Sequence, residues 1–285
     1  RRPGQTGQKE TRVTPRLSQP PTLIASDVDG TLIDSCSLVS QRTLDVLGAA
    51  RDAGTEFVLA TGRPPRWIPE ITEQFAGTRA RVRYAVCANG AIVYDLENDR
   101  ILHAAQLAPD VQRHLGDIVA RLLPTAGVAS ERAGNSAYDT ATPPFVASPG
   151  YQHAWLNPDH IEVSNDEIFA EPAVKLLVRV PEMQSRDMAT VLAGEVGDLA
   201  QITYSTSHGL IELSVPDTHK ASGLRTLIDL AGLGPVTSVA FGDMPNDIEM
   251  LTWADHGVAM AHSDPAAMGV QDLVVIAVKA PGLPD

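Results

Sequence analysis

The chain has 285 residues, of which 44% are hydrophobic and 20% are charged, which suits one large α/β domain or a core of moderate size with a second module. Its 22 lysines and arginines against 35 acidic residues give a formal net charge of −13, a balance that disfavours nucleic acid and anionic membranes as partners. Two cysteines are too few for a disulfide framework, and no apolar run approaches the ~20 residues of a membrane-spanning helix.

Residues 1–21 are rich in Arg, Gln, Thr, Pro and Gly and hold almost no apolar side chains, which predicts a disordered tail. The Arg1-Arg2 pair has no apolar segment after it and does not resemble an export signal, so a cytoplasmic location is expected. From Thr22 the pattern changes. Residues 23–26 form a short apolar run that predicts a buried strand, and the run ends in the turn-like segment Asp27-Val28-Asp29-Gly30-Thr31.

A helix and two further strands are predicted next. Ser40 suits an N-cap and Gly54 a C-terminal cap, and the apolar residues between them recur with helical spacing. A strand over 56–60 ends at Thr61-Gly62-Arg63, and another over 84–88 ends at Asn89-Gly90. In both cases, polar and glycine residues follow the strand directly.

The same alternation returns late in the chain. Helical spacing over 221–231 predicts a helix that begins near Asp217 and stops at Gly232. A strand over 236–241 follows, then Gly242-Asp243 and a helix from about Pro245, with two short strands predicted at 257–260 and 273–276. This repetition predicts an α/β fold with a Rossmann-like parallel sheet, in which ligands bind beyond the carboxyl ends of the strands.

Between residues 91 and 214 the pattern differs. Strands are predicted at 173–180, 201–205 and 210–215, and helices at 109–123 and 183–196. Residues 91–214 are therefore predicted to be an α+β domain inserted into a core made of 22–90 and 215–285. The proline-rich stretch 140–158 is predicted to be a loop whose aromatic residues pack on the inserted domain, with contact to a substrate as the alternative.

The segment 27–31 carries the first chemical signal. Residues i and i+2 of an extended chain face the same side, so Asp27 and Asp29 can point into one pocket. Two carboxylates so near to each other need a cation between them or a shared proton. A hard divalent ion satisfies them, and Mg²⁺ suits a site that also binds phosphate. Taken alone, the segment also fits an ordinary Asp-Gly turn.

Three more segments point the same way, although each has an ordinary explanation. The hydroxyl and backbone N–H groups of Thr61-Gly62-Arg63 can hold phosphate oxygens after a strand. Lys220 lies in the first turn of a predicted helix, where the dipole disfavours a cation, and it would be the local cation that an acidic protein needs for an anionic substrate. Asp243 follows an apolar strand directly, with Asn246 and Asp247 beside it; a helix cap and a first-turn acid would explain only the last two.

The four segments occur in the order Asp-x-Asp-Gly-Thr, Thr-Gly-Arg, Lys, Gly-Asp-x-x-Asn-Asp. In this the chain resembles the haloacid dehalogenase superfamily, and within it the Cof-like phosphatases, whose large C2B-type cap is inserted between the second and third motifs. The resemblance covers nearly everything from Thr22 onward. It implies a hydrolase that uses Mg²⁺ on a small phosphorylated metabolite.

The resemblance also implies roles for particular residues. Asp27 would be the nucleophile that forms an aspartyl phosphate, and Asp29 would be the general acid and then the general base. The metal would lie between the Asp27 carboxylate, the Asp29 backbone carbonyl and the Asp243 carboxylate, with Asp247 holding it directly or through water. The transferring phosphoryl group would be held by Thr61, Lys220, Asn246 and the backbone of Val28 and Gly62. Possible substrate contacts are Arg63, Asn89 and Lys175, although an ordinary solvated lysine would explain Lys175 as well.

Three departures from the family pattern stand out. The family usually has Gly directly after the motif-three Lys, whereas here Ala221 and Ser222 come before Gly223. His262 stands where the family usually has Asn, and the family's closing segment is only faintly visible after Asp272.

The leading hypothesis is hydrolysis of a phosphomonoester such as a sugar phosphate or flavin mononucleotide. A phosphomutase of the phosphomannomutase type would keep the aspartyl phosphate and pass the phosphate to a sugar. A binding protein that retains the fold without catalysis is the third alternative. Its mark would be loss of Asp27, Asp29, Lys220 or Asp243, and all four are present.

Overall fold

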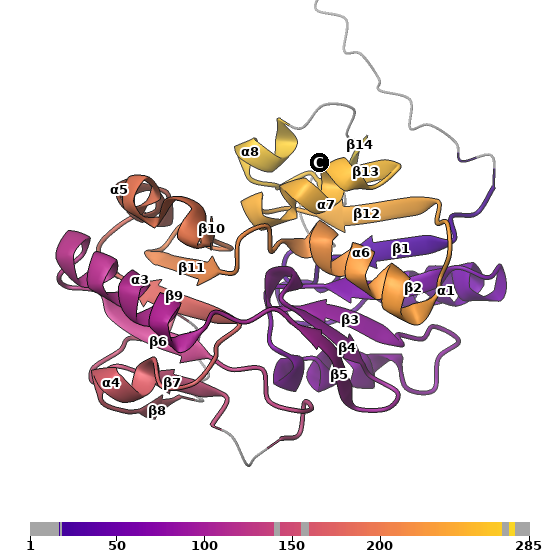
Figure 1. Cartoon of the computed structure of the whole chain (residues 1–285). Coiled ribbons are helices and arrows are strands. Elements are labelled where there is room, and N and C mark those ends of the chain that lie inside the picture. Colours follow the sequence, from indigo (N-terminus) through magenta and orange to yellow (C-terminus); the bar gives the residue numbers. More distant parts are fainter. Residues whose placement is uncertain (1–16, 18, 140–142, 155–159, 270–273, 277–285) are drawn as a thin grey trace, which may run out of the picture.

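The computed structural model describes residues 17, 19–139, 143–154 and 160–269 and the strand 274–276. These residues form two β-sheets with helices packed on them, and the two units lie side by side (Figure 1). Residues 1–16 and 18 lie outside this description, so the tail predicted over 1–21 stays a prediction.

The larger sheet contains both ends of the described chain. Its first six strands, in the order given below, are all parallel, and each of the last two pairs antiparallel with the strand before it. This arrangement confirms the predicted α/β class with a parallel core. The strand order is β14 (Val274–Ile276), β13 (His256–Met260), β12 (Ser238–Gly242), β1 (Leu23–Ser26), β2 (Glu56–Ala60), β3 (Tyr84–Cys87), β4 (Ile92–Asp95) and β5 (Arg100–Ala104).

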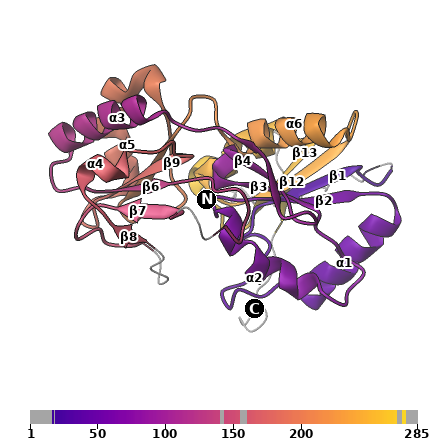
Figure 2. The same ribbon diagram turned by 60° about the horizontal axis from the view of Figure 1, so that its bottom comes forward.

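Helices cover both faces of this sheet because the strands are apolar on both sides. In β2, Phe57 and Leu59 face one core and Val58 and Ala60 the other, as a period of two requires. Figure 2 shows α6 on one face and α1 and α2 on the opposite face. The helices are α1 (Gln41–Asp52), η1 (Pro65–Trp67), α2 (Pro69–Thr72), η2 (Glu73–Phe75), η3 (Ala88–Gly90), α6 (Lys220–Ala231), η5 (Pro245–Asp247), α7 (Ile248–Trp253) and α8 (Pro265–Met268).

The second sheet is antiparallel except for its last pair, β7 and β8. One face is covered by α3 (Pro109–Leu122) and α5 (Ser185–Val196). The bounds of these helices agree to within two residues with the predicted helices 109–123 and 183–196. The order is β10 (Gln201–Thr203), β11 (Leu210–Ser214), β9 (Lys175–Arg179), β6 (Gly127–Glu131), β7 (Phe145–Ala147) and β8 (Ile161–Glu162), with α4 (Asn165–Ile168) and η4 (Gly197–Leu199) beside them.

Two features differ from the sequence prediction. Residues 92–104 form β4 and β5, which extend the larger sheet, so we now propose that the inserted domain begins after Ala104. The stretch 140–158 is not all loop, since β7 lies within it, paired with β6. Phe145 and Tyr151 pack together on the second sheet as predicted, whereas Trp155 and Pro158 lie outside the described residues.

The start of α6 also differs in detail. The predicted helix begins near Asp217, but Asp217 has φ +60° and the helix begins at Lys220. His219 is the N-cap, because its Nδ1 accepts a hydrogen bond from the Ser222 backbone N–H at 3.1 Å. Lys220 is therefore the first residue of the helix. None of the helices within the described part of the chain has the length and apolarity needed to cross a bilayer.

Packing of α6 on the sheet is testable with two leucines of the same helix. Leu227 is fully buried, so Leu227→Ala should lower the free energy of unfolding by about 2–5 kcal/mol in urea titration. Leu230 is 53% exposed, and Leu230→Ala should change that free energy by no more than about 0.5 kcal/mol. Equal losses in the two variants would contradict the orientation of α6.

Candidate active site

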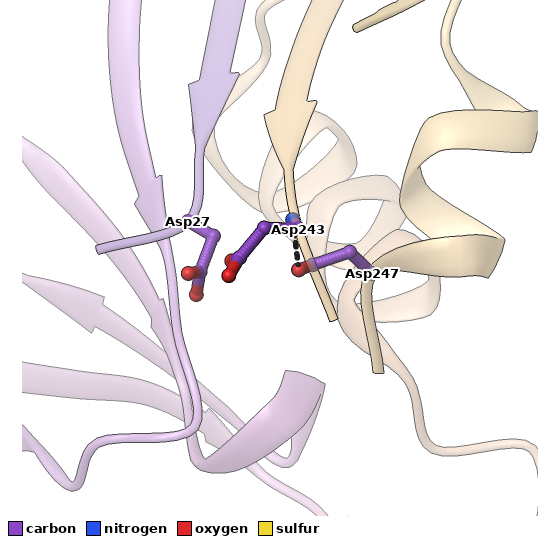
Figure 3. A group of neighbouring side chains, drawn as sticks. All are labelled: Asp27, Asp243 and Asp247. Carbon is purple, nitrogen blue, oxygen red and sulfur yellow. Dashed lines mark hydrogen bonds between the residues drawn. The ribbon is translucent and has the colours of Figure 1, made fainter. Parts of the chain in front are cut away.

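Three aspartates meet at one edge of the larger sheet. Asp27 follows β1 and Asp243 follows β12, and these strands are parallel neighbours, so both chains leave the sheet at the same edge. Asp247 is the last residue of η5 and lies four positions after Asp243 in the sequence. Each carboxylate offers an oxygen within 4.8 Å of the others, and all three side chains are buried. Figure 3 shows the Asp27 and Asp243 carboxylates side by side, with Asp247 beside them.

Lys220 lies against this cluster although it is far away in the sequence. Its Nζ donates to Asp27 Oδ1 at 2.5 Å and to Asp247 Oδ1 at 2.6 Å, and the side chain is fully buried. The other Asp247 oxygen accepts the backbone N–H groups of Asp243 and Met244 at 2.9 and 3.0 Å. The sequence prediction required this lysine beside the acidic cluster, and the structure places it there.

The cluster is electrostatically strained by its own charges. Burial raises the pKa of Asp27 well above its usual range; Lys220 opposes this rise and Asp247 adds to it. Burial also raises the pKa of Asp243, again with Asp247 adding to it. Burial alone would lower the pKa of Lys220, but Asp247 and Asp27 outweigh it and the net direction is upward. Three carboxylates and one ammonium leave two uncompensated negative charges when all are ionised.

These residues suit a hard divalent cation. They supply buried carboxylate oxygens, the ligands that Mg²⁺ prefers, and a cation would remove the excess negative charge. Two glycines leave the space that the carboxylates need. A Cβ on Gly30 would lie 2.5 Å from Asp243 Oδ2, and a Cβ on Gly242 would lie 2.5 Å from Asp247 Cγ. Thr31 orients Asp243 by donating from Oγ1 to its Oδ1 at 3.1 Å.

The Asp29 side chain lies outside the cluster. Its two oxygens accept from Arg63 Nε at 2.8 Å and from the terminal Nη2 of Arg63 at 2.7 Å. Arg63 also pairs with Glu70. The Asp29 side chain is 58% exposed, whereas that of Arg63 is only 14% exposed. Arg63, named from the sequence as a possible substrate contact, therefore holds the candidate general acid.

The Thr61-Gly62 turn lies at the same edge of the sheet. Thr61 is buried, and its Oγ1 accepts the Arg63 backbone N–H at 3.1 Å. The Thr61 carbonyl accepts from the Asn89 backbone N–H at 3.0 Å, which joins this turn to the one after β3. Asn89 has φ +53°, a left-handed conformation that asparagine tolerates better than most residues.

A cavity of about 450 Å³ lies between the two sheets. The second sheet contributes the face that carries no helices. Along β9, Leu176 and Val178 pack toward α3 and α5, while Lys175 and Leu177 line the cavity. The lining includes Asp27, Asp29, Gly62, Arg63, Arg66, Trp67, Glu131, Phe145, His153, Lys175, Glu212, Met244 and Asn246.

Lys175 connects the second unit to the turn after β2. Its Nζ donates to Glu212 Oε1 at 2.5 Å and to the Gly62 carbonyl at 3.0 Å, and both charged side chains are buried. Arg66 of η1 forms an ion pair with the buried Glu131 of β6. No sequence motif indicated Glu131, Glu212 or Arg66 as site residues. For Glu212, the available signal was a charged residue inside an apolar strand, Leu-Ile-Glu-Leu-Ser.

His262, which stands where the related family usually has Asn, lies at the rim of the cluster. Its Nε2 makes a 2.8 Å hydrogen bond with the Gly30 carbonyl oxygen and lies 3.8 Å from Asp243 Oδ2. The ring therefore connects the loop after β13 to the turn after β1.

Comparison with known proteins gives a consistent result. A sequence profile described as haloacid dehalogenase-like hydrolase matches residues 24–283. The chain is 29% identical over 258 residues to the 5-amino-6-(5-phospho-D-ribitylamino)uracil phosphatase YbjI of Escherichia coli, covering 86% of this chain and 87% of that protein. It is 27% identical over 268 residues to the pyridoxal phosphate phosphatase YbhA of the same species, covering 89% and 92%.

Among solved structures, a phosphatase of the HAD superfamily from Bacteroides thetaiotaomicron superposes with a TM-score of 0.70 at 23% identity. The match covers 93% of this chain and 92% of that one. At this identity the likeness shows a shared fold.

Magnesium binding is testable by thermal unfolding without any substrate. Because the folded-state pKa values of Asp27 and Asp243 are raised, the metal-free protein loses stability as pH rises from the ordinary carboxyl pKa through the raised ones. A cation offsets this loss. Mg²⁺ at about 100 times its Kd at pH 8 should raise Tm by roughly 5–10 °C at that pH, and the same Mg²⁺ concentration should raise Tm by less at pH 5.

The matched control for this measurement is Asp243→Asn, which removes one candidate ligand and should lose most of the Tm increase. An increase of the same size in that variant, or none in the unchanged protein, would contradict a metal site at the cluster.

Proposed function

The chain belongs to the haloacid dehalogenase-like hydrolases and is a phosphoric monoester hydrolase of that family, and we propose that it uses Mg²⁺ and the nucleophile Asp27 to remove phosphate from a small metabolite. The observation that carries this proposal is the position of Lys220. Its ammonium bridges Asp27 and Asp247 inside an acidic cluster that includes Asp243. A buried cation beside a carboxylate at the floor of a cavity suits the binding and attack of a phosphate group.

In the proposed reaction, an oxygen of Asp27 attacks phosphorus and the bond from phosphorus to the leaving oxygen breaks. Asp29, which lines the same cavity as Asp27, donates a proton to the leaving oxygen. Water then attacks phosphorus of the aspartyl phosphate, Asp29 takes the proton from that water, and Asp27 is released with inorganic phosphate.

The other residues bind and orient the phosphoryl group. Mg²⁺, held by Asp27, Asp243 and the Asp29 carbonyl with Asp247 directly or through water, would supply charge neutralisation. Lys220 and Thr61 would donate to the phosphoryl oxygens, together with the N–H groups of Val28 and Gly62 and an N–H of Asn246. Phosphoryl transfer depends mainly on such positioning and charge stabilisation.

The substrate is proposed to be a small phosphorylated metabolite, such as a sugar phosphate or flavin mononucleotide. Two relatives are named for phosphatase activity on compounds of this class, the ribitylamino-uracil phosphate and pyridoxal phosphate. The cavity of about 450 Å³ has room for a leaving group of that size. Its far wall comes from the second unit, which we propose is a cap that closes over the substrate, excludes water and selects the leaving group. The expected cytoplasmic location stays a prediction.

The nucleophile is tested by Asp27→Asn. Turnover of p-nitrophenyl phosphate with Mg²⁺ should fall by at least about 1,000-fold, because an amide oxygen does not form the covalent intermediate. Circular dichroism should show an unchanged fold. Retained turnover in the folded variant would contradict the proposal, and isomerised sugar phosphate without phosphate release would favour a phosphomutase instead.

The role of Arg63 is tested by changing the leaving group. If Arg63 orients Asp29 as a general acid, Arg63→Met should lower kcat/KM for β-glycerophosphate by about 10- to 100-fold, and much less for p-nitrophenyl phosphate, whose leaving group needs little protonation. An equal loss for both substrates would indicate instead that Arg63 binds the phosphate or the substrate. Arg79→Met is the control, since Arg79 is an exposed arginine paired with Asp52, and it should leave both values unchanged.

A further inference from the structure

A chain of buried side chains connects the second unit to the acidic cluster. Glu212 of β11 accepts a hydrogen bond at its Oε2 from Asn89 Nδ2 at 2.5 Å. Asn89 Oδ1 in turn accepts from Asn246 Nδ2 at 2.9 Å. All three residues are at least nine-tenths buried. They come from three distant parts of the sequence, since Asn89 is separated from Glu212 by a sequence offset of 123 and from Asn246 by an offset of 157.

The direction of this chain follows from the chemistry of Glu212. An ionised carboxylate has only acceptors, whereas an amide side chain has a donor end and an acceptor end. Asn89 must therefore turn its NH₂ group toward Glu212, which leaves its oxygen for Asn246. Asn246 must then turn its own NH₂ group toward Asn89. The orientation of both amides is thus set by one carboxylate that comes from the other unit.

The series of hydrogen bonds ends at an acceptor atom, Asn246 Oδ1. Asn246 Oδ1 is buried and has no hydrogen-bond partner among the described residues, and Asn246 lines the cavity beside Asp27. An unpartnered buried oxygen destabilises the site, and a bound O–H donor would remove that cost. Asn246 directly precedes Asp247, whose carboxylate holds Lys220, so the amide lies next to the catalytic cluster.

Glu212 is itself held in place by ionic contacts. Its other oxygen, Oε1, accepts from Lys175 at 2.5 Å, and Lys175 also reaches the Gly62 carbonyl at 3.0 Å. Glu212 and Lys175 both come from the second sheet, while Asn89 lies in η3, Asn246 in η5 and Gly62 in the turn after β2, all at one edge of the first sheet. This series of hydrogen bonds from Glu212 to Asn246 therefore forms only when the two units are in contact with each other.

We propose that Glu212 is a positioning residue for phosphoryl transfer: by orienting Asn89 and through it Asn246, it makes the active-site amide present its oxygen only when the second unit is closed on the first. This inference rests on the proposed phosphatase function. The open oxygen of Asn246 then serves an O–H donor in the cavity, the attacking water or a substrate hydroxyl.

A simpler role for Glu212 would be to neutralise the buried Lys175. Two double-mutant cycles on kcat separate the roles. The first combines Glu212→Gln with Asn89→Gly, because glycine keeps the left-handed backbone at position 89 while removing the amide. The second combines Glu212→Gln with Lys175→Met. Turnover of p-nitrophenyl phosphate with saturating Mg²⁺ gives kcat and KM for each protein, and thermal unfolding gives Tm.

Glutamine at position 212 has both a donor and an acceptor, so it no longer dictates the amide orientation. Glu212→Gln should lower kcat about 10-fold, with a change in KM of less than about threefold, because the generic substrate still binds but the site is misoriented. In the Asn89→Gly background, Glu212→Gln should lower kcat no further. In the Lys175→Met background it should lower kcat by the full factor again.

The two cycles also separate an effect on stability, measured as Tm, from an effect on kcat. Glu212→Gln leaves a buried lysine unpaired and should lower Tm, and adding Lys175→Met should restore Tm while the loss of kcat caused by Glu212→Gln remains. If Glu212→Gln alone does not fold, the double variant Glu212→Gln/Lys175→Met, in which neither charge of the pair remains, takes its place, and its kcat is compared with that of Lys175→Met. Glu195→Gln, an exposed glutamate on α5, is the control and should keep kcat and Tm.

Three results would overturn the inference: an unchanged kcat in Glu212→Gln, a full further loss in the Asn89→Gly background, or no loss in the Lys175→Met background. The last result would assign Glu212 to charge neutralisation. Failure of the proposed function itself looks different, because the unchanged protein would then release no phosphate from any phosphomonoester.

Discussion

The molecule is organised around one electrostatic constraint, a cluster of three buried carboxylates that holds a single buried ammonium. Taking charges out of water is costly unless they are compensated, and the Lys220 ammonium offsets only part of the charge of Asp27, Asp243 and Asp247. The rest of the fold supports this arrangement. Neighbouring parallel strands bring Asp27 and Asp243 to one edge, and Gly30 and Gly242 clear the space for the carboxylates. The His219 cap starts α6 at Lys220.

The second sheet extends the same logic across the cavity. Its helix-free face carries buried charges, each paired with a group of the first unit or with its neighbour. Arg66 meets Glu131, and Lys175 contacts both Glu212 and the Gly62 carbonyl. Because a buried charge without a partner is strongly destabilising, these contacts favour one seating of the two units. The same charged side chains that join the two units therefore line the cavity between them.

Prediction from the sequence succeeded where local patterns decide the structure. Periodicity and capping residues predicted the parallel strands and the helices near 109–123 and 183–196. They also placed three of the motifs directly after strands and Lys220 near the start of a helix. The prediction missed β4, β5, β6, β7 and β8. The first two extend a sheet edge by antiparallel pairing, and β7 is a three-residue strand behind two prolines that is defined by its partner β6. A strand that short carries no periodicity of its own, so only its neighbours in space define it.

The sequence by itself determined the fold class, the family resemblance and the candidate residues Asp27, Asp29, Lys220 and Asp243, because a carboxylate or an ammonium directly after a strand or at a helix start is a local feature. The tertiary structure alone decided which of these groups touch. It joined Lys220 to Asp27 and Asp247, turned Asp29 toward Arg63, and connected Glu212 to Asn246 through Asn89. These contacts span up to 193 positions of the chain, and hydrogen-bond partners at that separation depend on sheet order and domain packing, which no local pattern encodes.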